Sequence, residues 1–497
     1  MQAAEIPFGE FLPDQPTYKN PGCIAANNVF PISGGYGPFA GGNPQGDTNT
    51  EAVRGAAQMF RNDGTSIVVG GSDTILFILV GGTLTATGSL NSIGADNYWD
   101  FAQFNDYVFA VSENNNPKYL SDIDSDTSWS DAPGSPPEAK VIGRVGYFLM
   151  VGNLTDLGLP TTLQWSAEND PTDWPTPGTN DARLKQSSRV ALQPEYGEIT
   201  GIAGDRFPMV FQQRAISRID PVGPPTVFRI TPIEEARGCI APQSIVTVGF
   251  QTYFLSHDGF WMTDGNSVQP IGNSRINQWF FDNVSETDRF RTQGTVVWEK
   301  QAIIWNFYPA SEATGFKRQI IYSFKENRWS TASLTCDWIV DNKVGATTLE
   351  DLDALFADLE SVDPDLDSSY WGARSRVLSA FIQNGSAASE LNLLNGDSLE
   401  AQFQTGEMQP APGKRVECNG AFPVVEDLED AVMCGASARE NKGSTQTSSS
   451  TNTINGAGFC PFRIEGRYVS GRMVIPAGTN WNKAQGMQLE FRTTGAR

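Results

Sequence analysis

A repeated pattern of apolar strand, tight polar turn and second strand fills the chain from about residue 67 to residue 333. The pattern is clear in TILFILV-GG-TLTATG from Thr74, DYVFAVS-ENNNP-KYLSD from Asp106 and TYFLS-HDG-FWMTDG from Thr252. Further copies begin at positions 145, 208 and 302, so successive starts differ by 32, 39, 63, 44 and 50 residues. Any fold for this chain must therefore accommodate many short hairpins in series.

Units of about 40–50 residues with about four strands each are typical of propeller blades. The 49 glycines and 30 prolines suit many short strands joined by tight turns. The repeat therefore predicts an all-β fold whose main part, residues 51–340, is a β-propeller-like body of repeated hairpins. Because the sequence has no WD or kelch motif, a tandem β-sandwich is the structural alternative.

One segment, TLEDLDALFADLES, breaks the strand pattern. Its apolar residues recur at helical spacing, with acidic residues on the opposite face. The apolar stripe consists of Leu349, Leu352, Leu355, Phe356 and Leu359. We expect an acidic amphipathic helix with its connector in residues 341–375, docked on the β body through this stripe.

The two ends of the chain differ in their sequence patterns. Residues 1–50 carry turn residues without periodicity, which predicts an extended N-terminal arm that lies over another surface. Residues 376–497 return to strand-like segments, which predicts a C-terminal β domain. Within that domain, the polar low-complexity residues 438–458 are expected to form a mobile loop between two strands.

The C-terminal domain ends on a strand-like stretch, GRYVSGRMVIPAGTNWNKAQG, at residues 466–486. Met473 and Ile475 alternate as strand residues do, whereas Tyr468 falls out of their phase. We expect a bulge at Gly471 to reset the phase.

The Pro-Ala-Gly turn that follows is expected to be plugged by Trp481, and residues 488–492 alternate as a partner strand for the first one. This pair is predicted to close the C-terminal domain. The alternative is that it forms a sheet edge between subunits.

The single histidine limits the chemistry available to the chain. His257 lies in LSHDGFW, which is typical of a hairpin turn with Gly259 at positive φ. We favour this turn over a catalytic base, because histidine occupies many non-catalytic positions.

A second motif, DIDSDTSW, places Asp122, Asp124 and Asp126 at alternate positions, like the start of a calcium loop. Thr127 stands where an EF-hand needs glycine, and Pro133 stands where it needs the bidentate glutamate. We therefore predict a solvated acidic turn, with a weak ion site as the alternative. This motif and SHDGFW also resemble the Asp-box turns of sialidase-like propellers, which stabilise hairpins.

The sequence assigns no catalytic, cofactor-binding or metal-binding residue, and we expect no enzyme activity and no cofactor. It has no histidine–cysteine cluster, Walker loop, GxSxG motif or GxGxxG after a strand. The functional alternative is a propeller-type glycosidase or carbohydrate-binding protein that acts on a host surface polysaccharide. The 57 acidic residues do not single out a carboxylate pair. The strand tryptophans are expected in the core. They are Trp165, Trp174, Trp261, Trp305 and Trp329.

The net charge limits the kinds of binding partner we expect, and the cysteine content indicates the compartment in which the protein is made. A net charge of −22 disfavours adhesive binding to nucleic acid and to an anionic membrane. Six cysteines without a CxxC motif are expected to be free thiols of a protein made in a reducing cytoplasm. Cys418, Cys434 and Cys460 share one region, so a local pair among them stays open. The first residues show no signal-peptide pattern, and the longest apolar run is too short to span a membrane.

Four regions in order resemble the tail hub or nozzle proteins of short-tailed bacteriophages, also called packaged-DNA stabilisation proteins. The first is the Pro-rich opening PDQPTYKNPGCIAANNVFPISGGYGPF, and the second is the hairpin TLQWSAENDPTDW. The third is the acidic helix followed by LDSSYWG, and the fourth comprises LEAQFQTGEMQPAPGKR and the stretch at residues 466–486. The likeness spans nearly the whole chain. The Ser/Thr-rich loop around residues 444–455 departs from it.

The resemblance implies a structural virion protein of the phage tail, assembled in the host cytoplasm. Such a protein forms a ring, of six subunits, below the portal and adaptor, and it also meets the tail needle, fibre or spike proteins. It retains packaged DNA and conducts it during ejection without binding it specifically. An acidic channel lining is compatible with that role, because it keeps DNA from adhering.

Overall fold

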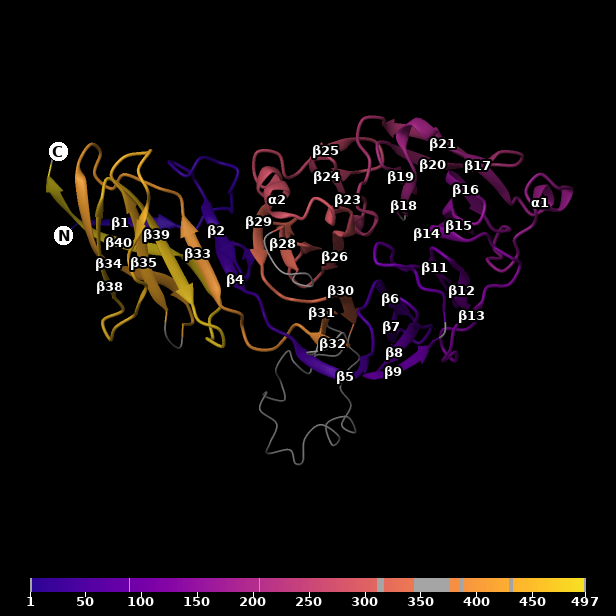
Figure 1. Cartoon of the computed structure of the whole chain (residues 1–497), viewed down its shortest axis with the longest axis horizontal. Helices are drawn as coiled ribbons and strands as arrows, with labels where there is room; N and C mark the ends of the chain where they lie inside the picture. Colours follow the sequence, from indigo (N-terminus) through magenta and orange to yellow (C-terminus); the bar gives the residue numbers. More distant parts are fainter. Residues whose placement is uncertain are drawn as a thin grey trace, which may run out of the picture.

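The computed structural model describes residues 2–88, 90–204, 206–310, 317–343, 376–383, 388–428 and 432–495. It shows an all-β chain in two parts, a propeller and a smaller two-sheet sandwich beside it (Figure 1). The predicted fold class, a β-propeller-like body with a C-terminal β domain, is confirmed. The predicted helix around Leu349–Leu359 lies outside the described residues.

The propeller has seven four-stranded antiparallel blades around a central axis (Figure 1). The first strand of each blade is innermost, since neighbouring first strands contact one another around the axis. Blade 1 consists of β6 (Ala56–Phe60), β7 (Ser66–Gly71), β8 (Leu76–Val80) and β9 (Thr83–Thr87). Blade 2 consists of β10 (Asp100–Phe104), β11 (Tyr107–Ser112), β12 (Asn115–Leu120) and β13 (Ser130–Asp131). Blade 3 consists of β14 (Ala139–Val145), β15 (Phe148–Leu154), β16 (Leu159–Trp165) and β17 (Ser188–Ala191). Blade 4 consists of β18 (Ile199–Ala203), β19 (Met209–Gln212), β20 (Ile216–Gly223) and β21 (Val227–Glu234). Blade 5 consists of β22 (Val246–Val248), β23 (Gln251–Ser256), β24 (Gly259–Thr263) and β25 (Val268–Pro270). Blade 6 consists of β26 (Gln293–Val297), β27 (Ala302–Phe307), β28 (Arg318–Ser323) and β29 (Arg328–Ala332).

The helical elements of the described residues are short and lie in the connections of the propeller. Helix α1 (Asn180–Leu184) begins after Thr179, whose side chain accepts a hydrogen bond from the backbone N–H of Ala182. The remaining elements are α2 (Asn277–Asn283), η1 (Pro194–Tyr196), η2 (Pro242–Ser244) and η3 (Arg289–Arg291). In the described part of the chain, no helix is long and apolar enough to cross a membrane.

Blade 7 joins the two ends of the propeller. Its inner strands are β30 (Trp338–Lys343), β31 (Arg376–Gln383) and β32 (Ser389–Leu393), and its outer strand is β5 (Asn43–Asn49), which precedes blade 1 in the chain. The strand β5 also contacts blade 1, because the Asp47 backbone N–H donates to the Gly82 oxygen at 2.9 Å. It therefore clasps the last blade to the first.

The first 50 residues were expected to form an extended arm, but the structure places five strands there, β1 to β5. The physical reason is that these short strands find their partners in distant parts of the chain. An outer strand such as β5 buries little of its surface, so its sequence, NPQGDTN, has no apolar alternation to reveal it. Residues 376–383 and 389–393 likewise belong to blade 7 and are not part of the sandwich.

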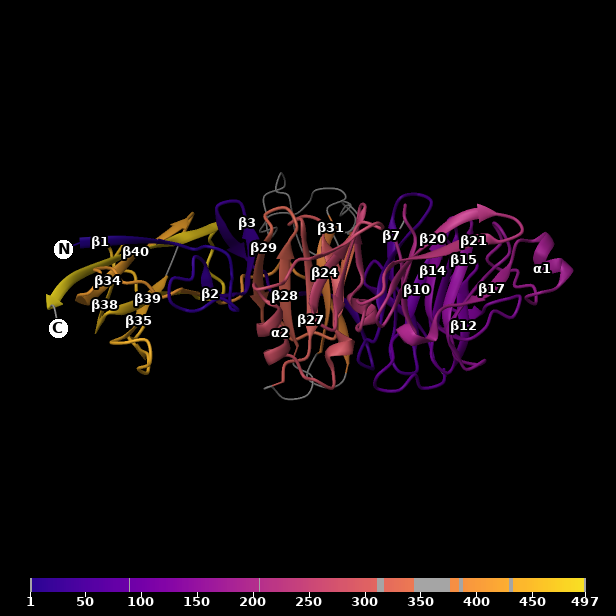
Figure 2. The ribbon, with the colours of Figure 1, turned by 90° about the horizontal axis from the view of Figure 1, so that it is seen from above.

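The sandwich combines strands from both ends of the chain, and both termini lie at its outer end (Figure 2). One sheet has the order β3-β4-β40-β34-β38, with β1 also paired to β40; the other has the order β2-β33-β39-β35-β36, with β37 also paired to β35. The first sheet consists of β1 (Gln2–Pro7), β3 (Val29–Ile32), β4 (Gly35–Pro38), β34 (Arg415–Glu426), β38 (Cys460–Gly466) and β40 (Lys483–Gly495). The second consists of β2 (Cys23–Asn27), β33 (Ala401–Thr405), β35 (Met433–Arg439), β36 (Thr447–Ser448), β37 (Asn452–Thr453) and β39 (Tyr468–Ile475).

The last two strands are not partners of each other, so the predicted C-terminal hairpin is wrong. Strand β39 lies between β33 and β35, whereas β40 lies in the opposite sheet between β34 and the N-terminal strands. The turn after Ile475 and the buried Trp481 lead the chain from one sheet to the other. Met473 and Ile475 are buried as expected, but alternation alone does not distinguish a hairpin from a crossing between sheets.

The predicted bulge at Gly471 is also absent. The pairing of β39 with β35 runs without a shift from Tyr468 to Val474, and Tyr468 lies on the face away from the sandwich core. Gly471 serves a different purpose: a Cβ there would lie 2.3 Å from the Met487 sulfur of the opposite sheet. The glycine therefore allows the two sheets to approach closely.

Residues 438–458 were expected to form a mobile loop, but the structure holds part of them in the sheet. The short strands β36 and β37 both pair with β35, and the Ser437 and Ser448 hydroxyls lie 2.8 Å apart. Nearby, Cys434 and Cys460 adjoin each other in the sandwich core as free thiols. All six cysteines are buried and unpaired, which answers the open question of a local disulfide.

Blades 5 and 6 of the propeller share one continuous hydrophobic core with the sandwich. At the junction, Phe11 of the N-terminal segment packs edge-on against Trp279 of α2, with ring centroids 5.5 Å apart. Strand β2 also pairs with β29 of blade 6 at Asn27 and Thr331. These contacts fix the sandwich against blade 6 (Figures 1 and 2).

Candidate axial binding site

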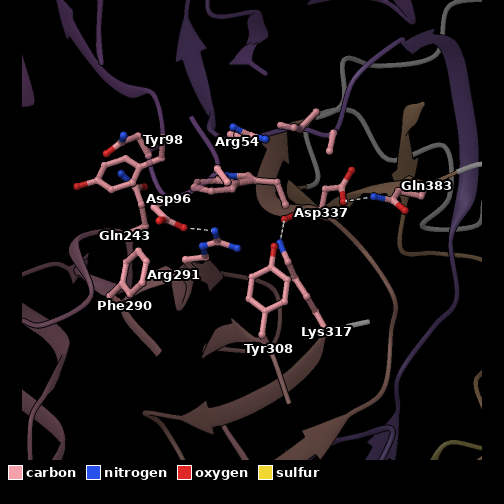
Figure 3. A pocket seen from close by; sticks show the side chains of 15 residues that line it. Arg54, Asp96, Tyr98, Gln243, Phe290, Arg291, Tyr308, Lys317, Asp337 and Gln383 are labelled. Atoms are coloured by element: carbon pink, nitrogen blue, oxygen red, sulfur yellow. Dashed lines mark hydrogen bonds and ion pairs between the residues drawn. The ribbon is translucent and has the colours of Figure 1, made fainter. Parts of the chain in front are cut away.

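A cavity of about 340 Å³ opens on the axis at the end where the innermost strands begin (Figure 3). Loops of five blades line it. Arg54 precedes β6, Asp96 precedes β10, Gln243 lies before β22, Arg291 lies before β26 and Asp337 lies before β30. A pocket that gathers polar side chains from so many blades is the default candidate for a ligand site.

Arg291 is the central cation of this pocket. Its guanidinium forms ion pairs with Asp96, from the other side of the axis, and with Asp288, whose Oδ1 lies 3.2 Å from Nη1. The guanidinium carbon lies 5.7 Å from the ring centroids of both Phe290 and Tyr308. The Nε atom is buried and has no hydrogen-bond partner among the described residues.

A second cation stands on the other side of the Tyr308 ring (Figure 3). The Lys317 Nζ lies 4.7 Å from the ring centroid and donates to the backbone oxygen of Asp337. The Asp337 carboxylate is itself held by Gln383, at 2.8 Å, and by Ser389. Both acids of the pocket lining, Asp96 and Asp337, are thus already bound by protein groups. The wall also carries a third cation, Arg54, which pairs with Asp73 at 2.9 Å.

The pocket continues along the axis into a second cavity of about 280 Å³, which shares Gln243 and Trp338 with the first. Hydrogen bonds between neighbouring blades stabilise this channel. Gln293 donates to the Ile339 oxygen at 2.8 Å and accepts from the Ile339 N–H at 3.2 Å. The Trp338 indole donates to the Ala56 oxygen at 3.1 Å, which ties blade 7 to blade 1.

Asp100, at the start of β10, is expected to make the stability of the propeller depend on pH. Burial raises the pKa of Asp100 to about 7, although its carboxylate accepts hydrogen bonds from the N–H groups of Ile142 (3.0 Å) and Phe101 (3.1 Å). The folded chain holds this proton at pH values where the unfolded chain has released it. The contribution of Asp100 to stability should therefore decrease from about pH 4 to about pH 7.

We expect Asp100→Asn to remove that decrease, so that the variant gains up to about 2–3 kcal/mol relative to the wild type between pH 4.5 and 7.5. Urea unfolding at both pH values measures the difference. Parallel stability profiles for the two proteins would show that Asp100 ionises normally.

The two polar motifs of the sequence, around His257 and around Asp122, form separate turns in blades 5 and 2. His257 lies in the turn between β23 and β24, 3.4 Å from the Ser256 hydroxyl, and Gly259 has a φ of +135°, so the predicted turn is confirmed. The carboxylates of Asp122 and Asp126 accept hydrogen bonds from N–H and hydroxyl groups of their own turn, as expected for an acidic turn.

Four of the five strand tryptophans are buried in the core, as predicted. They are Trp165, Trp174, Trp305 and Trp329. The fifth, Trp261, is half-buried: its ring centroid lies 4.4 Å from the Arg237 guanidinium, and its indole donates to Asp258 at 2.7 Å.

The opposite face of the propeller carries a second feature, which we call the aromatic collar. Its members end or follow the innermost strand of blades 1, 3, 4, 5 and 6, next to the turn to the second strand, and each is more than a third exposed. They are Phe60, Tyr147, Phe207, Phe250 and Trp298. Arg206 lies 5.2 Å from the Phe250 ring, and Arg376 lies 5.2 Å from the Trp298 ring. The collar holds every highly exposed aromatic among the described residues.

Comparison with known proteins identifies fold relatives only. No family model matches the chain, and no curated protein matches it. YCF48, in a structure bound to a D1 peptide, has 12% identity and a TM-score of 0.37 over 72% of this chain and 97% of that one. The Pan2 WD40 domain of Neurospora crassa has 7% identity and a TM-score of 0.39 over 70% and 90%. At these TM-scores the similarities carry no argument about function, and the propeller assignment rests on the strand pairing of this chain.

Proposed function

We propose that this chain is a structural protein of a short-tailed bacteriophage virion. It forms the ring of the tail nozzle or hub, most simply a hexamer, below the portal and adaptor, and it meets needle, fibre or spike proteins. The ring retains packaged DNA and conducts it during ejection. The proposal rests on the ordered resemblance in sequence and on a surface suited to protein partners.

The aromatic collar is the observation that carries the proposal. Exposed aromatic side chains with arginines stacked on them have the composition of protein-interface cores, where Tyr, Trp, Phe and Arg are enriched. Large exposed apolar patches on a folded protein mark interaction sites. In a chain with a net charge of −22, the collar is a local concentration of aromatic and cationic groups that suits an assembly partner.

The residues behind the resemblance support a structural role. The opening segment supplies β2, β3 and β4, which join the sandwich to blade 6. In the hairpin motif, the indoles of Trp165 and Trp174 donate to the backbone oxygens of Gln186 and Pro171 at 2.8 and 2.9 Å. These hydrogen bonds fix both tryptophans within blade 3, which suits a structural role for the motif.

The test replaces three collar residues at once, Tyr147→Ser, Phe250→Ser and Trp298→Ser. A matched variant replaces three exposed aliphatic residues outside the collar, Leu157→Ser, Leu184→Ser and Val222→Ser. Because all six side chains are exposed, both variants should keep the wild-type melting temperature. Only the collar variant should lose incorporation into particles, measured by complementing phage that lack the gene.

Two results would contradict the proposal at different levels. Particles that lack this protein and still retain their DNA would overturn the nozzle function. Normal incorporation of the collar variant would show that the collar is not an assembly surface.

A further inference from the structure

The axial pocket has the features of a binding site for an anion. Its wall carries Arg291 and Lys317, and also Arg54, which is paired with Asp73 at 2.9 Å. The Asp337 carboxylate accepts hydrogen bonds from Gln383 and Ser389. Asp96 is the one acid that reaches Arg291 across the opening (Figure 3). We propose that this pocket binds a small organic anion consisting of a single sugar ring with a carboxylate or phosphate, held at Arg291 in place of Asp96.

The hydrogen-bonding state of Arg291 supports this assignment. Asp288 occupies Nη1 and Asp96 occupies Nη2, but the buried Nε has no partner in the described part of the chain. The Nε and Nη2 groups form one edge of the guanidinium, which a carboxylate or phosphate binds through two parallel hydrogen bonds. A ligand that takes this whole edge satisfies the buried donor, which Asp96 leaves unpaired.

The Asp96 carboxylate is suited to being displaced from Arg291 by a ligand. Its side chain is 71% exposed, whereas that of Arg291 is 25% exposed. An ion pair with one partner in solvent is weak, so an external anion can displace this carboxylate. Asp96 then acts as an internal competitor, and its removal should strengthen binding.

The aromatic residues that line the rest of the pocket provide surfaces for the sugar ring of the ligand. Tyr98, Tyr308, Phe290 and Trp338 present aromatic surface to the cavity, and sugar and aromatic rings pack against such faces. A volume of about 340 Å³ fits a monosaccharide better than an oligomer. This binding site is independent of the nozzle proposal, since it lies in the channel and not at the collar.

The experiment is isothermal titration of the full chain with D-glucuronate and with glucose 6-phosphate. Neutral glucose and inorganic phosphate serve as the ligand controls. Both charged sugars should bind at least about tenfold more tightly than either control. Glucose lacks the anionic group that binds Arg291, and inorganic phosphate lacks the sugar ring. Comparing the two charged sugars shows whether the pocket prefers a carboxylate or a phosphate.

Three variants test the residues. Arg291→Ala should weaken binding of the charged sugars at least about tenfold, and Asp96→Asn should strengthen it about three- to fivefold. The matched control is Arg237→Ala, which removes an arginine that is also stacked on an aromatic ring and paired with an aspartate, outside the pocket. It should leave binding unchanged.

The outcomes separate clearly. If neither charged sugar binds the wild type at millimolar concentration, or if Asp96→Asn binds no more tightly than the wild type, the proposal is wrong. Equal affinity for inorganic phosphate and glucose 6-phosphate would also overturn it, because the ring would then play no part. The Asp96→Asn result decides the matter even if Arg291→Ala lowers the melting temperature, since Asp96 is exposed and its replacement is structurally mild.

Discussion

Removal of residues 466–497 is expected to abolish folding of the entire sandwich, even in the isolated subunit. The deletion takes away β39 and β40, and these are interior strands of the two opposing sheets. The N-terminal strands β1 and β4 lose their partner at the same time. The loss should equal the whole stability of a small domain, roughly 5–15 kcal/mol. Calorimetry should show that one unfolding transition disappears, and hydrogen exchange should show that β34 and β35 lose protection.

The control for this truncation removes only residues 494–497. Phe491 is the last buried side chain described in β40, so this removal should leave the transition intact. A truncated chain that keeps the full transition but fails to join virions would show that the segment is an interface between subunits. That outcome would contradict the closing role that the structure gives to β39 and β40.

The second large effect concerns the clasp between blades 7 and 1. Gly46, in β5, has a φ of +92°, and a Cβ there would lie 2.0 Å from the backbone oxygen of Gly82 in blade 1. We expect Gly46→Val to force β5 away from blade 1 and to destabilise the chain by about 4–5 kcal/mol, near the upper end for a single substitution. Chemical denaturation measures this loss of unfolding free energy.

Gly64 provides a closely matched control. Its φ is +84°, but a Cβ at this position would meet no atom within 4 Å, so Gly64→Val carries the backbone strain without the clash. The strain alone should cost about 1–2 kcal/mol. Equal destabilisation by the two substitutions would mean that the contact between β5 and blade 1 contributes nothing to closure.

The repeated hairpins made most of the propeller predictable from the sequence. The six predicted hairpins, which start at positions 74 to 302, fall one in each of blades 1 to 6. Blade 7 was missed because its strands are far apart in sequence: β30 and β31 are separated by residues 344–375, and β5 comes from near the start of the chain. A period in the sequence reveals consecutive strands only.

The C-terminal part shows a different limit. Alternation at Met473 and Ile475 and in residues 488–492 correctly indicates two half-buried strands, but the period of two does not reveal which strand is the partner. The pairing of β40 with β1 joins Phe491 to Gln2, and no local pattern indicates such a contact.

The candidate site was not predictable because its residues come from separate loops. Arg291 and Asp96 are 195 residues apart, and they meet only when blades 2 and 6 face each other across the axis. The collar has a sequence signal that is visible afterwards: an aromatic residue at the first turn of most blades. Without the blade boundaries, that recurrence does not stand out among the 53 aromatic residues of the chain.

The pairing of the first strand with the last has a consequence for synthesis in the cell. The ribosome releases Gln2 long before it adds Phe491, and at about 5–20 residues per second the interval is roughly 25–100 s. During that time β1 and β4 await β40, β2 awaits β33, and β5 awaits β32 of blade 7. The chain therefore cannot complete its fold from one end to the other as it emerges, and the polar, proline-rich character of its opening segment protects a waiting edge from premature pairing.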